Sequence, residues 1–190
     1  MIKATAQELV QAALATLEED GFAGATSRAI ARRAGVNQAL VFYHFGSVED
    51  LLVAALRATS EERLARYREA LADVTTVDEL IQVGARLYEE DKASGHMTVA
   101  SQLIAGSVGR PELAPKVLAL MEPWIAFATE TLERILPPGL PAKELAYATV
   151  TFYTGVNLLT HLDAEGTRTD ALFARAAELA PLVGQLLKAQ

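Results

Sequence analysis

The chain has no cysteine among its 190 residues, which excludes disulfides, thiolate metal sites and a cysteine nucleophile. The absence of cysteine fits a reducing compartment, and we expect a cytoplasmic protein. The first ten residues lack a basic segment followed by an apolar one, so no signal peptide is predicted. The longest uncharged run, residues 145–162, contains four threonines, an asparagine and a histidine. This composition favours a buried helix over a membrane span.

Acidic residues are missing from one stretch of an otherwise acidic chain. The net charge of −7 argues against a nucleic-acid partner for the chain as a whole. Residues 21–48, however, contain no Asp or Glu, where the average composition predicts roughly three or four. The basic residues and the histidine of this stretch are Arg28, Arg32, Arg33 and His44. The charge pattern therefore favours contact with a polyanion in this segment alone.

Helix signals run through the whole chain. Apolar residues recur at three- and four-residue spacing, and no stretch alternates as a strand does. Residue pairs typical of helix N-terminal caps are Thr5 with Glu8, Ser47 with Asp50 and Thr76 with Glu79. We predict an all-α protein in which a small N-terminal module joins a larger helical body. Helices are predicted at about residues 5–21, 27–34, 37–44, 48–71, 76–93, 97–107, 112–136, 142–162 and 170–188.

Residues 26–51 fit a helix-turn-helix. Gly35 permits the positive φ of a sharp turn between two short helices, Ala31 is small where the helices cross, and Val41 is expected to be buried between them. The other face of the second helix then points outward and fits a DNA major groove. A solvated basic face on two short surface helices remains an alternative reading of the same pattern.

The outward-facing residues divide by the part of DNA that they would contact. Base edges are assigned to Gln38, through hydrogen bonds, and to Ala39 and Leu40, through thymine methyl groups. Asn37 is expected to cap the helix first and to contact a phosphate second. The residues assigned to phosphates are Thr26, Ser27, Arg28, Tyr43 and His44.

The segment from Thr26 through AGVNQALVFYHF to Leu51 resembles the DNA-binding module of TetR-family transcriptional regulators. The resemblance covers about residues 5–55. It implies a three-helix helix-turn-helix domain over residues 1–50 and a helical effector-binding and dimerisation domain over residues 51–190. It adds Phe42 to the DNA-binding residues, at a position where the family usually has a phosphate-binding tyrosine. Val48 stands where the family usually has a lysine, so both departures imply a weaker electrostatic contribution.

The resemblance further implies a homodimer formed through the last two helices and bound to double-stranded operator DNA. We expect a repressor that leaves its operator when a small, largely apolar effector binds in the body. Arg134 is the only basic residue between Val117 and Ala142, which favours a neutral or cationic effector. Candidate pocket residues, which could equally be ordinary core, are Tyr88, Met97, Gln102, Met121, Trp124, Phe127, Tyr147, Phe152, Tyr153, Asn157 and His161.

Signals for catalysis and for bound cofactors are weak. The three histidines are far apart, and the chain has neither a glycine-rich phosphate loop nor a nucleophile elbow. We therefore predict no enzyme activity, cofactor, metal site or membrane partner. The acidic run Glu89–Asp91 is expected to be a solvated helix end. The rival hypothesis is a small-molecule-binding protein with a degenerate helix-turn-helix.

Overall fold

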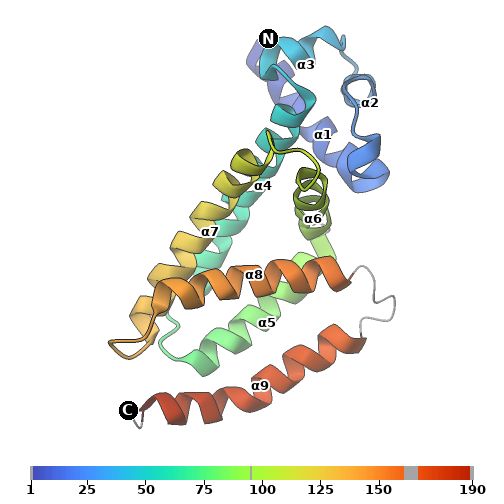
Figure 1. Cartoon of the computed structure of the whole chain (residues 1–190). Coiled ribbons are helices and arrows are strands. Elements are labelled where there is room, and N and C mark those ends of the chain that lie inside the picture. Colours follow the sequence, from blue (N-terminus) through green and yellow to red (C-terminus); the bar gives the residue numbers. More distant parts are fainter. Residues whose placement is uncertain (1, 95, 161–166, 189–190) are drawn as a thin grey trace. The chain divides into compact units, whose positions relative to one another are not determined.

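The computed structural model describes residues 2–94, 96–160 and 167–188, and these residues form helices without a strand (Figure 1). The predicted all-α class is confirmed, and the nine helices found in the described ranges follow the nine predicted ones. Their bounds are α1 Ile2–Gly24, α2 Ser27–Arg33, α3 Ala39–Phe45, α4 Val48–Ala70, α5 Val77–Ser94, α6 His96–Ser107, α7 Ala114–Ile135, α8 Ala142–Thr160 and α9 Thr167–Lys188.

Local sequence signals account for the helix ends. Gly21, at φ 71° and ψ −179°, breaks the helical geometry of α1 where the helix was predicted to end. Ser47 Oγ accepts the backbone N–H of Asp50 at 3.0 Å and so caps α4. At the start of α5, Thr76 Oγ1 accepts the N–H of Glu79 at 3.2 Å, and the Glu79 carboxylate accepts the N–H of Thr76 at 3.1 Å. The predicted caps at Ser47 and Thr76 are confirmed, whereas the predicted cap at Thr5 is wrong, because α1 begins at Ile2 and Thr5 lies inside it. The first helix begins at Ile2, a few residues before the predicted start.

The chain divides into two compact units that are not continuous in sequence. The first unit contains Met1–Glu62 and Gly95–Leu120, and the second contains Arg63–Ser94 and Met121–Gln190. Helices α4 and α7 therefore each contribute residues to both units. This packing differs from a division after residue 50, because α6 packs with α1 in the first unit. The functional boundary between residues 1–50 and 51–190 stays a prediction.

Helices α1 and α6 approach closely in the first unit at Gly106. A Cβ atom at this position would lie 2.8–2.9 Å from three ring atoms of Phe22, so only glycine fits against the ring as it stands. The Arg110 guanidinium lies over the same ring, 5.1 Å from its centroid. Arg110 Nη1 also donates to Glu49 Oε1 at 2.8 Å. Phe22 thus links the end of α1 to α6 and to the segment that follows α6.

The second unit has an apolar cluster between α4, α5 and α7. Arg134 of α7 donates to the carbonyl oxygens of Leu71 and Ala72 at 2.7 and 2.5 Å. Leu71 and Ala72 directly follow the end of α4, so Arg134 ties α7 to the backbone just beyond that helix. The buried members of the cluster are Leu64, Tyr67, Leu71, Val74, Leu87 and Phe127.

Helix α8 is buried on one face and exposed on another, although residues 145–162 were expected to form a buried helix. Ala146, Val156 and Asn157 are buried. The large apolar side chains that remain exposed on this helix are Leu145, Tyr147, Phe152, Leu158 and Leu159. Among the described residues, no single helix is long and apolar enough to cross a bilayer.

Replacing Gly106 by alanine is expected to lower the free energy of unfolding by about 1 kcal/mol in urea denaturation. The better helix propensity of alanine favours folding by up to about 1 kcal/mol, but overpacking against the Phe22 ring costs about 1–3 kcal/mol. Gly84→Ala is the matched control, because a Cβ at this helical glycine meets nothing within 4 Å, and this change is expected to stabilise. In a Phe22→Leu background the Gly106→Ala loss should disappear. An equal gain from both glycine changes would contradict the packing argument.

Candidate nucleic-acid interface and buried polar cluster

The turn between α2 and α3 has the geometry that the sequence predicts. Gly35 adopts φ +67°, in the region that favours glycine. The N–H of Val36 donates to the carbonyl oxygen of Ala31 at 3.0 Å. Ile30 and Ala31 of α2 and Val41 of α3 are buried. The inner faces of the two helices are therefore fixed by packing, and the outer face of α3 is left for contacts outside the chain.

The predicted base-reading residues lie on this outer face. Gln38 and Ala39 are exposed and Leu40 is half-buried. Gln38 directly precedes α3, and its Nε2 donates to Ser27 Oγ at 2.7 Å. Asn37 Oδ1 accepts the N–H of Ala39 at 2.8 Å, so its predicted capping role is confirmed. The start of α3 is thus held by side-chain hydrogen bonds.

Most of the predicted phosphate contacts surround this face. Tyr43 is 70% exposed and Phe42 is half exposed, whereas His44 is partly buried with its ring 5.0 Å from that of Tyr43. Thr26 Oγ1 accepts the N–H of Ala29 at 3.2 Å and caps α2, and Arg28 is exposed in the first turn of this helix.

Arg33 is held by an acid of α1. Its guanidinium donates to both carboxylate oxygens of Glu19, at 2.7 and 2.5 Å. This pairing raises the pKa of Arg33 and lowers the pKa of Glu19. Arg33 is exposed, but its charge is neutralised within the chain, and Arg28 and Arg32 are also exposed on α2.

Two cations from beyond residue 100 neutralise the acidic first turn of α4. Lys116 Nζ lies 2.5 Å from Asp50 Oδ1, and Arg110 pairs with Glu49. The hydrogen bond from Lys116 and that from Ser47 lower the pKa of the Asp50 carboxyl. Sequence reasoning missed both cations, because they stand 61 and 66 positions from their partners and no local pattern marks them.

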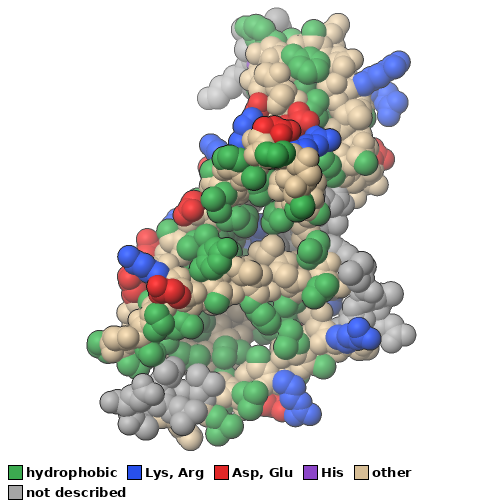
Figure 2. Space-filling view, viewed as in Figure 1, with side chains coloured by type: hydrophobic (Ala, Val, Ile, Leu, Met, Phe, Trp, Pro, Cys, Tyr) green, Lys and Arg blue, Asp and Glu red, His purple; other side chains and the backbone are tan. Residues whose placement is uncertain are grey.

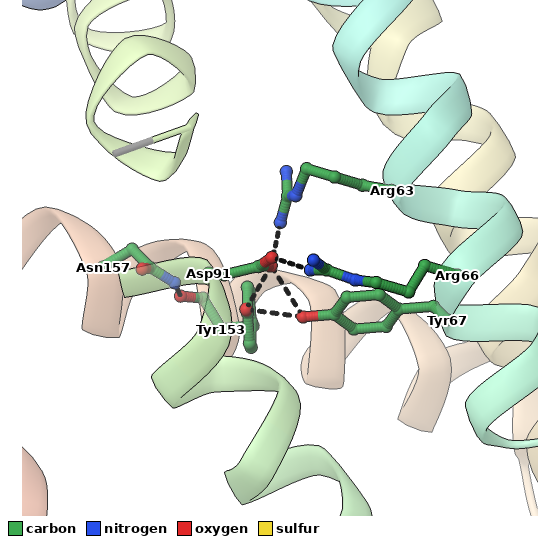
Figure 3. A network of polar contacts seen from close by, with 6 residues as sticks. All are labelled: Arg63, Arg66, Tyr67, Asp91, Tyr153 and Asn157. Atoms are coloured by element: carbon green, nitrogen blue, oxygen red, sulfur yellow. Dashed lines mark hydrogen bonds and ion pairs between the residues drawn. The ribbon is translucent and has the colours of Figure 1, made fainter. Parts of the chain in front are cut away.

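A second group of polar side chains lies inside the second unit, around the Asp91 carboxylate (Figure 3). We call Arg63, Arg66, Tyr67, Asp91 and Tyr153 the Asp91 cluster. Asp91 is 0% exposed and forms ion pairs with both arginines. The hydroxyl oxygens of Tyr67 and Tyr153 lie 2.8 and 3.0 Å from Asp91 Oδ2 and 2.7 Å from each other.

Electrostatics keep the Asp91 carboxyl ionised. Burial would raise its pKa, but the hydrogen bonds and charge of Arg63 and the two tyrosine hydroxyls outweigh burial and leave the pKa below its ordinary value. Burial raises the pKa of Tyr67 and of Tyr153, so both tyrosines stay neutral. The cluster therefore combines buried ionised groups with neutral hydroxyl donors.

The expectation that Glu89–Asp91 is a solvated helix end is wrong for Asp91. Glu89 and Glu90 are exposed, whereas Asp91 follows the buried Leu87 by four residues and the buried Tyr88 by three. This spacing puts Asp91 on the buried face of α5. An acid in register with an apolar face was the signal that could have identified it.

Some of the predicted pocket residues lie in or beside the Asp91 cluster, others are buried, half-buried or exposed elsewhere, and the rest lie outside the described residues. Tyr153 belongs to the Asp91 cluster, and the Tyr88 ring lies 5.8 Å from the Tyr153 ring. The Trp124 ring lies 5.1 Å from the Tyr67 ring. Other predicted members in the second unit are Phe127 and Asn157, which are buried, Met121, which is half-buried, and Tyr147 and Phe152, which are exposed. The side chains of Met97 and Gln102, and all of His161, lie outside the described residues.

Comparison with known proteins gives a consistent result for the N-terminal module. Residues 9–55 match the family model described as bacterial regulatory proteins, tetR family. The transcriptional regulator BetI of Stenotrophomonas maltophilia is 33% identical over 112 residues, which are 57% of each chain. The chain thus spans a little over half the length of this curated relative. Residues 9–55 are thus a TetR-family module.

Solved structures extend the similarity to the whole fold. A TetR-family regulator from Rhodococcus has a TM-score of 0.74 at 16% identity, covering 93% of this chain and 97% of its own. The multidrug binding protein EbrR in complex with imidazole has a TM-score of 0.64 at 25% identity, covering 90% and 93%. The proteins matched by sequence are named transcriptional regulators and not enzymes, in agreement with the prediction from the sequence.

Replacing Asp91 by asparagine is expected to lower the free energy of unfolding by about 3 kcal/mol, because the buried guanidinium of Arg63 and the half-buried one of Arg66 lose their counter-charge. Since the folded-state pKa of Asp91 is lowered, its contribution is present at neutral pH and is lost as pH falls through that pKa. The difference in free energy of unfolding between wild type and Asp91→Asn should therefore become smaller at acidic pH. Urea denaturation across pH measures it.

The neighbouring acid provides the control for this change. Glu90 is exposed, so Glu90→Gln is expected to change the free energy of unfolding by no more than about 0.5 kcal/mol. Equal effects of the two substitutions at neutral pH would show that the buried carboxylate does not stabilise the second unit.

Proposed function

We propose that this protein is a transcriptional repressor that binds operator DNA as a homodimer and leaves it when a small, largely apolar effector binds its helical body. The observation that carries the proposal is the outer face of α3. Gln38, Ala39 and Tyr43 are exposed there, while Val41 on the opposite side is buried against α2. This arrangement, in a family of DNA-binding regulators, supports insertion of α3 into a major groove.

The charge distribution supports DNA as the partner in spite of the acidic chain. Arg28 and Arg32 are exposed on α2, and Tyr43 carries an exposed hydroxyl. The acids closest in sequence to this face, Glu49 and Asp50, are paired with Arg110 and Lys116. Repulsion between the start of α4 and DNA phosphates is thereby reduced, even though Val48 replaces the usual lysine.

Exposed apolar side chains on α8 and α9 support a homodimer. On α8, Leu145, Phe152 and Leu159 stand seven residues apart and share one face. On α9, Leu172, Leu179 and Leu182 form a similar stripe. Figure 2 shows hydrophobic side chains over both helices. A two-fold pair of these stripes would remove them from water and bring two copies of α3 to one palindromic site.

The aromatic interior of the second unit supports effector binding. Tyr67, Tyr88, Trp124 and Tyr153 contact one another at ring-centroid distances of 5.1–6.5 Å, beside the polar groups of the Asp91 cluster. Apolar walls with a few convergent polar groups are typical of small-molecule sites. EbrR, which has the same fold, is named a multidrug binding protein. The proposed repressor acts in the cytoplasm.

A small-molecule-binding protein with a degenerate helix-turn-helix is the second candidate. It is favoured by Phe42 and Val48, which replace two phosphate-binding residues usual in the family, and by the net charge of −7. Competition-resistant binding to a fragment of the source genome, measured by fluorescence anisotropy, is expected for the repressor. Absence of such binding across all fragments supports the second candidate.

Two substitutions test the division between base and phosphate contacts. Gln38→Ala should relax discrimination at one base pair per half-site by about 1–3 kcal/mol. Arg28→Ala should weaken binding to all DNA sequences by the same factor. It should also reduce the salt dependence of binding by about one ion per half-site. Arg86→Ala, an exposed arginine of α5, removes the same charge and is expected to leave DNA binding unchanged. Uniform losses from both Gln38→Ala and Arg28→Ala would contradict the assignment.

Charge placed on the α8 stripe tests the homodimer. Phe152 is 50% exposed, so Phe152→Glu should leave the fold intact and convert dimers to monomers in sedimentation equilibrium, because a carboxylate would be desolvated at the interface. Tyr43→Glu is the matched control on α3 and should remain dimeric while losing DNA affinity. A wild-type chain that sediments as a monomer, with and without DNA, would exclude the homodimer.

A further inference from the structure

We propose that the effector is an organic carboxylate, whose anionic group binds the Arg66 guanidinium at the Asp91 cluster and whose apolar part packs against Trp124 and the neighbouring aromatic side chains. This inference rests on the proposed function, because it names the chemical class of ligand that the helical body takes. It starts from four observations on the described residues of the second unit: charge, access, an unsatisfied donor and the state of the aromatic rings.

The charges of the Asp91 cluster do not cancel. Among the described residues, the guanidiniums of Arg63 and Arg66 both pair with the one carboxylate of Asp91. Tyr67 and Tyr153 contribute neutral hydroxyls. The five side chains of the cluster therefore sum to one positive charge, in a partly desolvated place where Coulomb interactions are stronger than in water. An anionic ligand would balance this charge, and a cationic ligand would increase it.

Arg66 is the most exposed of the three charged members of the cluster. Its side chain is 41% exposed, whereas the side chains of Arg63 and Asp91 are 10% and 0% exposed. Arg66 Nη2 donates to Asp91 Oδ1, which fixes the orientation of the planar group. The other guanidinium nitrogen, Nη1, offers two more donors beyond this contact. The guanidinium is thus held in place before a ligand arrives.

One donor of Arg66 is left over in the described structure. Its Nε is buried and makes no hydrogen bond to any described residue. A buried N–H without an acceptor costs about as much as a lost hydrogen bond. A carboxylate supplies two acceptor oxygens, and arginine binds carboxylates with several donors at once. A neutral amide has one carbonyl acceptor and brings donors that find no acceptor on a guanidinium.

The aromatic rings argue against a cationic ligand. The Arg63 guanidinium lies over the Trp124 ring at 5.1 Å, and the Arg66 guanidinium lies 6.0 Å from the Tyr67 ring centroid. Faces of these rings that would attract a ligand cation therefore already carry cations of the protein. Trp124 and Tyr153 are half-buried, so part of their surface is exposed for apolar contact with the rest of the ligand.

This inference reverses the expectation of a neutral or cationic effector. That expectation came from the scarcity of basic residues between Val117 and Ala142, whereas the arginines of the cluster come from α4. A purely structural role for the cluster is the competing explanation. Buried ion pairs contribute little net stability relative to apolar packing, and a structural role predicts no preference for the charge of a ligand.

The single tryptophan of the chain provides the readout. Trp124 lies against Arg63 and Tyr67, so its fluorescence reports binding at the cluster without DNA. The full-length protein is titrated with 4-phenylbutyrate and octanoate, with the corresponding amides, and with trimethylammonium compounds carrying the same apolar groups. At least one carboxylate is expected to bind saturably and about tenfold or more tighter than its amide and its ammonium counterpart.

Substitutions then locate the anion. Arg66→Gln should weaken carboxylate binding about tenfold or more and leave amide binding within about twofold, and Arg66→Lys should recover part of the loss. Arg86→Gln, which removes an exposed arginine of the same unit, should change neither. Thermal unfolding of each variant checks that it is folded. If Arg66→Gln does not fold, Arg66→Lys alone tests the site. This variant should then bind carboxylates more weakly than the wild type and bind amides equally well.

Three results would overturn the inference: no saturable binding by any carboxylate, amides or ammonium compounds that bind as tightly, or carboxylate binding unchanged in both Arg66 variants. A separate anisotropy measurement on operator DNA distinguishes this inference from the proposed function. An uncharged compound could release DNA and shift the Trp124 fluorescence while carboxylates have no effect. This result would reject the carboxylate as the effector but would retain the proposal of a ligand-released repressor. Carboxylate binding that depends on Arg66 without DNA release would retain the carboxylate site and reject effector release.

Discussion

The continuity of α4 is the constraint on which both candidate sites depend. Its first turn begins at the Ser47 cap and carries the acids that pair with Arg110 and Lys116. Its C-terminal half carries Arg63, Arg66 and Tyr67 and ends at carbonyl oxygens bonded by Arg134. One hydrogen-bonded helix thus contributes to the unit that contains α3 and to the unit that contains the Asp91 cluster. The proposed release of DNA by a ligand at Arg66 would require this helix to couple the two sites, and by linkage DNA would then weaken the binding of that ligand by the same factor.

Local pairing resolves the conflict between an acidic chain and a DNA partner. The net charge of −7 is an average, whereas a phosphate responds to charges within about one Debye length, roughly 8–10 Å at physiological salt. Within the first unit, Glu19 is paired with Arg33, and Glu49 and Asp50 are paired with Arg110 and Lys116. Arg28 and Arg32 remain exposed on α2. The local charge that a DNA phosphate meets therefore depends on which acids are paired with cations. Amino-acid composition does not contain this information.

The sequence predicted those features that depend on neighbours within one or two helical turns. The helix ranges, the caps at Ser47 and Thr76, the positive φ of Gly35 and the burial of Val41 all follow from local spacing and backbone sterics. The Asp91 cluster was missed because its partners stand 24 to 62 positions away along the chain. Asp91 was visible as an acid in register with an apolar face, but its arginines, on another helix, had no such mark. Local periodicity identifies the face of a helix, and it does not identify which distant side chains meet there.

The apolar stripes of α8 and α9 show what a single chain leaves unsatisfied. Each helix has a second face that is buried within its own unit: Ala146 and Val156 on α8, and Ala180 on α9. The exposed stripes hold six large side chains, Leu145, Phe152, Leu159, Leu172, Leu179 and Leu182, each between 39% and 61% exposed. Burying such a half-exposed side chain contributes on the order of 1 kcal/mol, so two chains together gain on the order of 10 kcal/mol. This gain is comparable to the association cost of about 4–15 kcal/mol, which is the size of gain that the proposed homodimer requires.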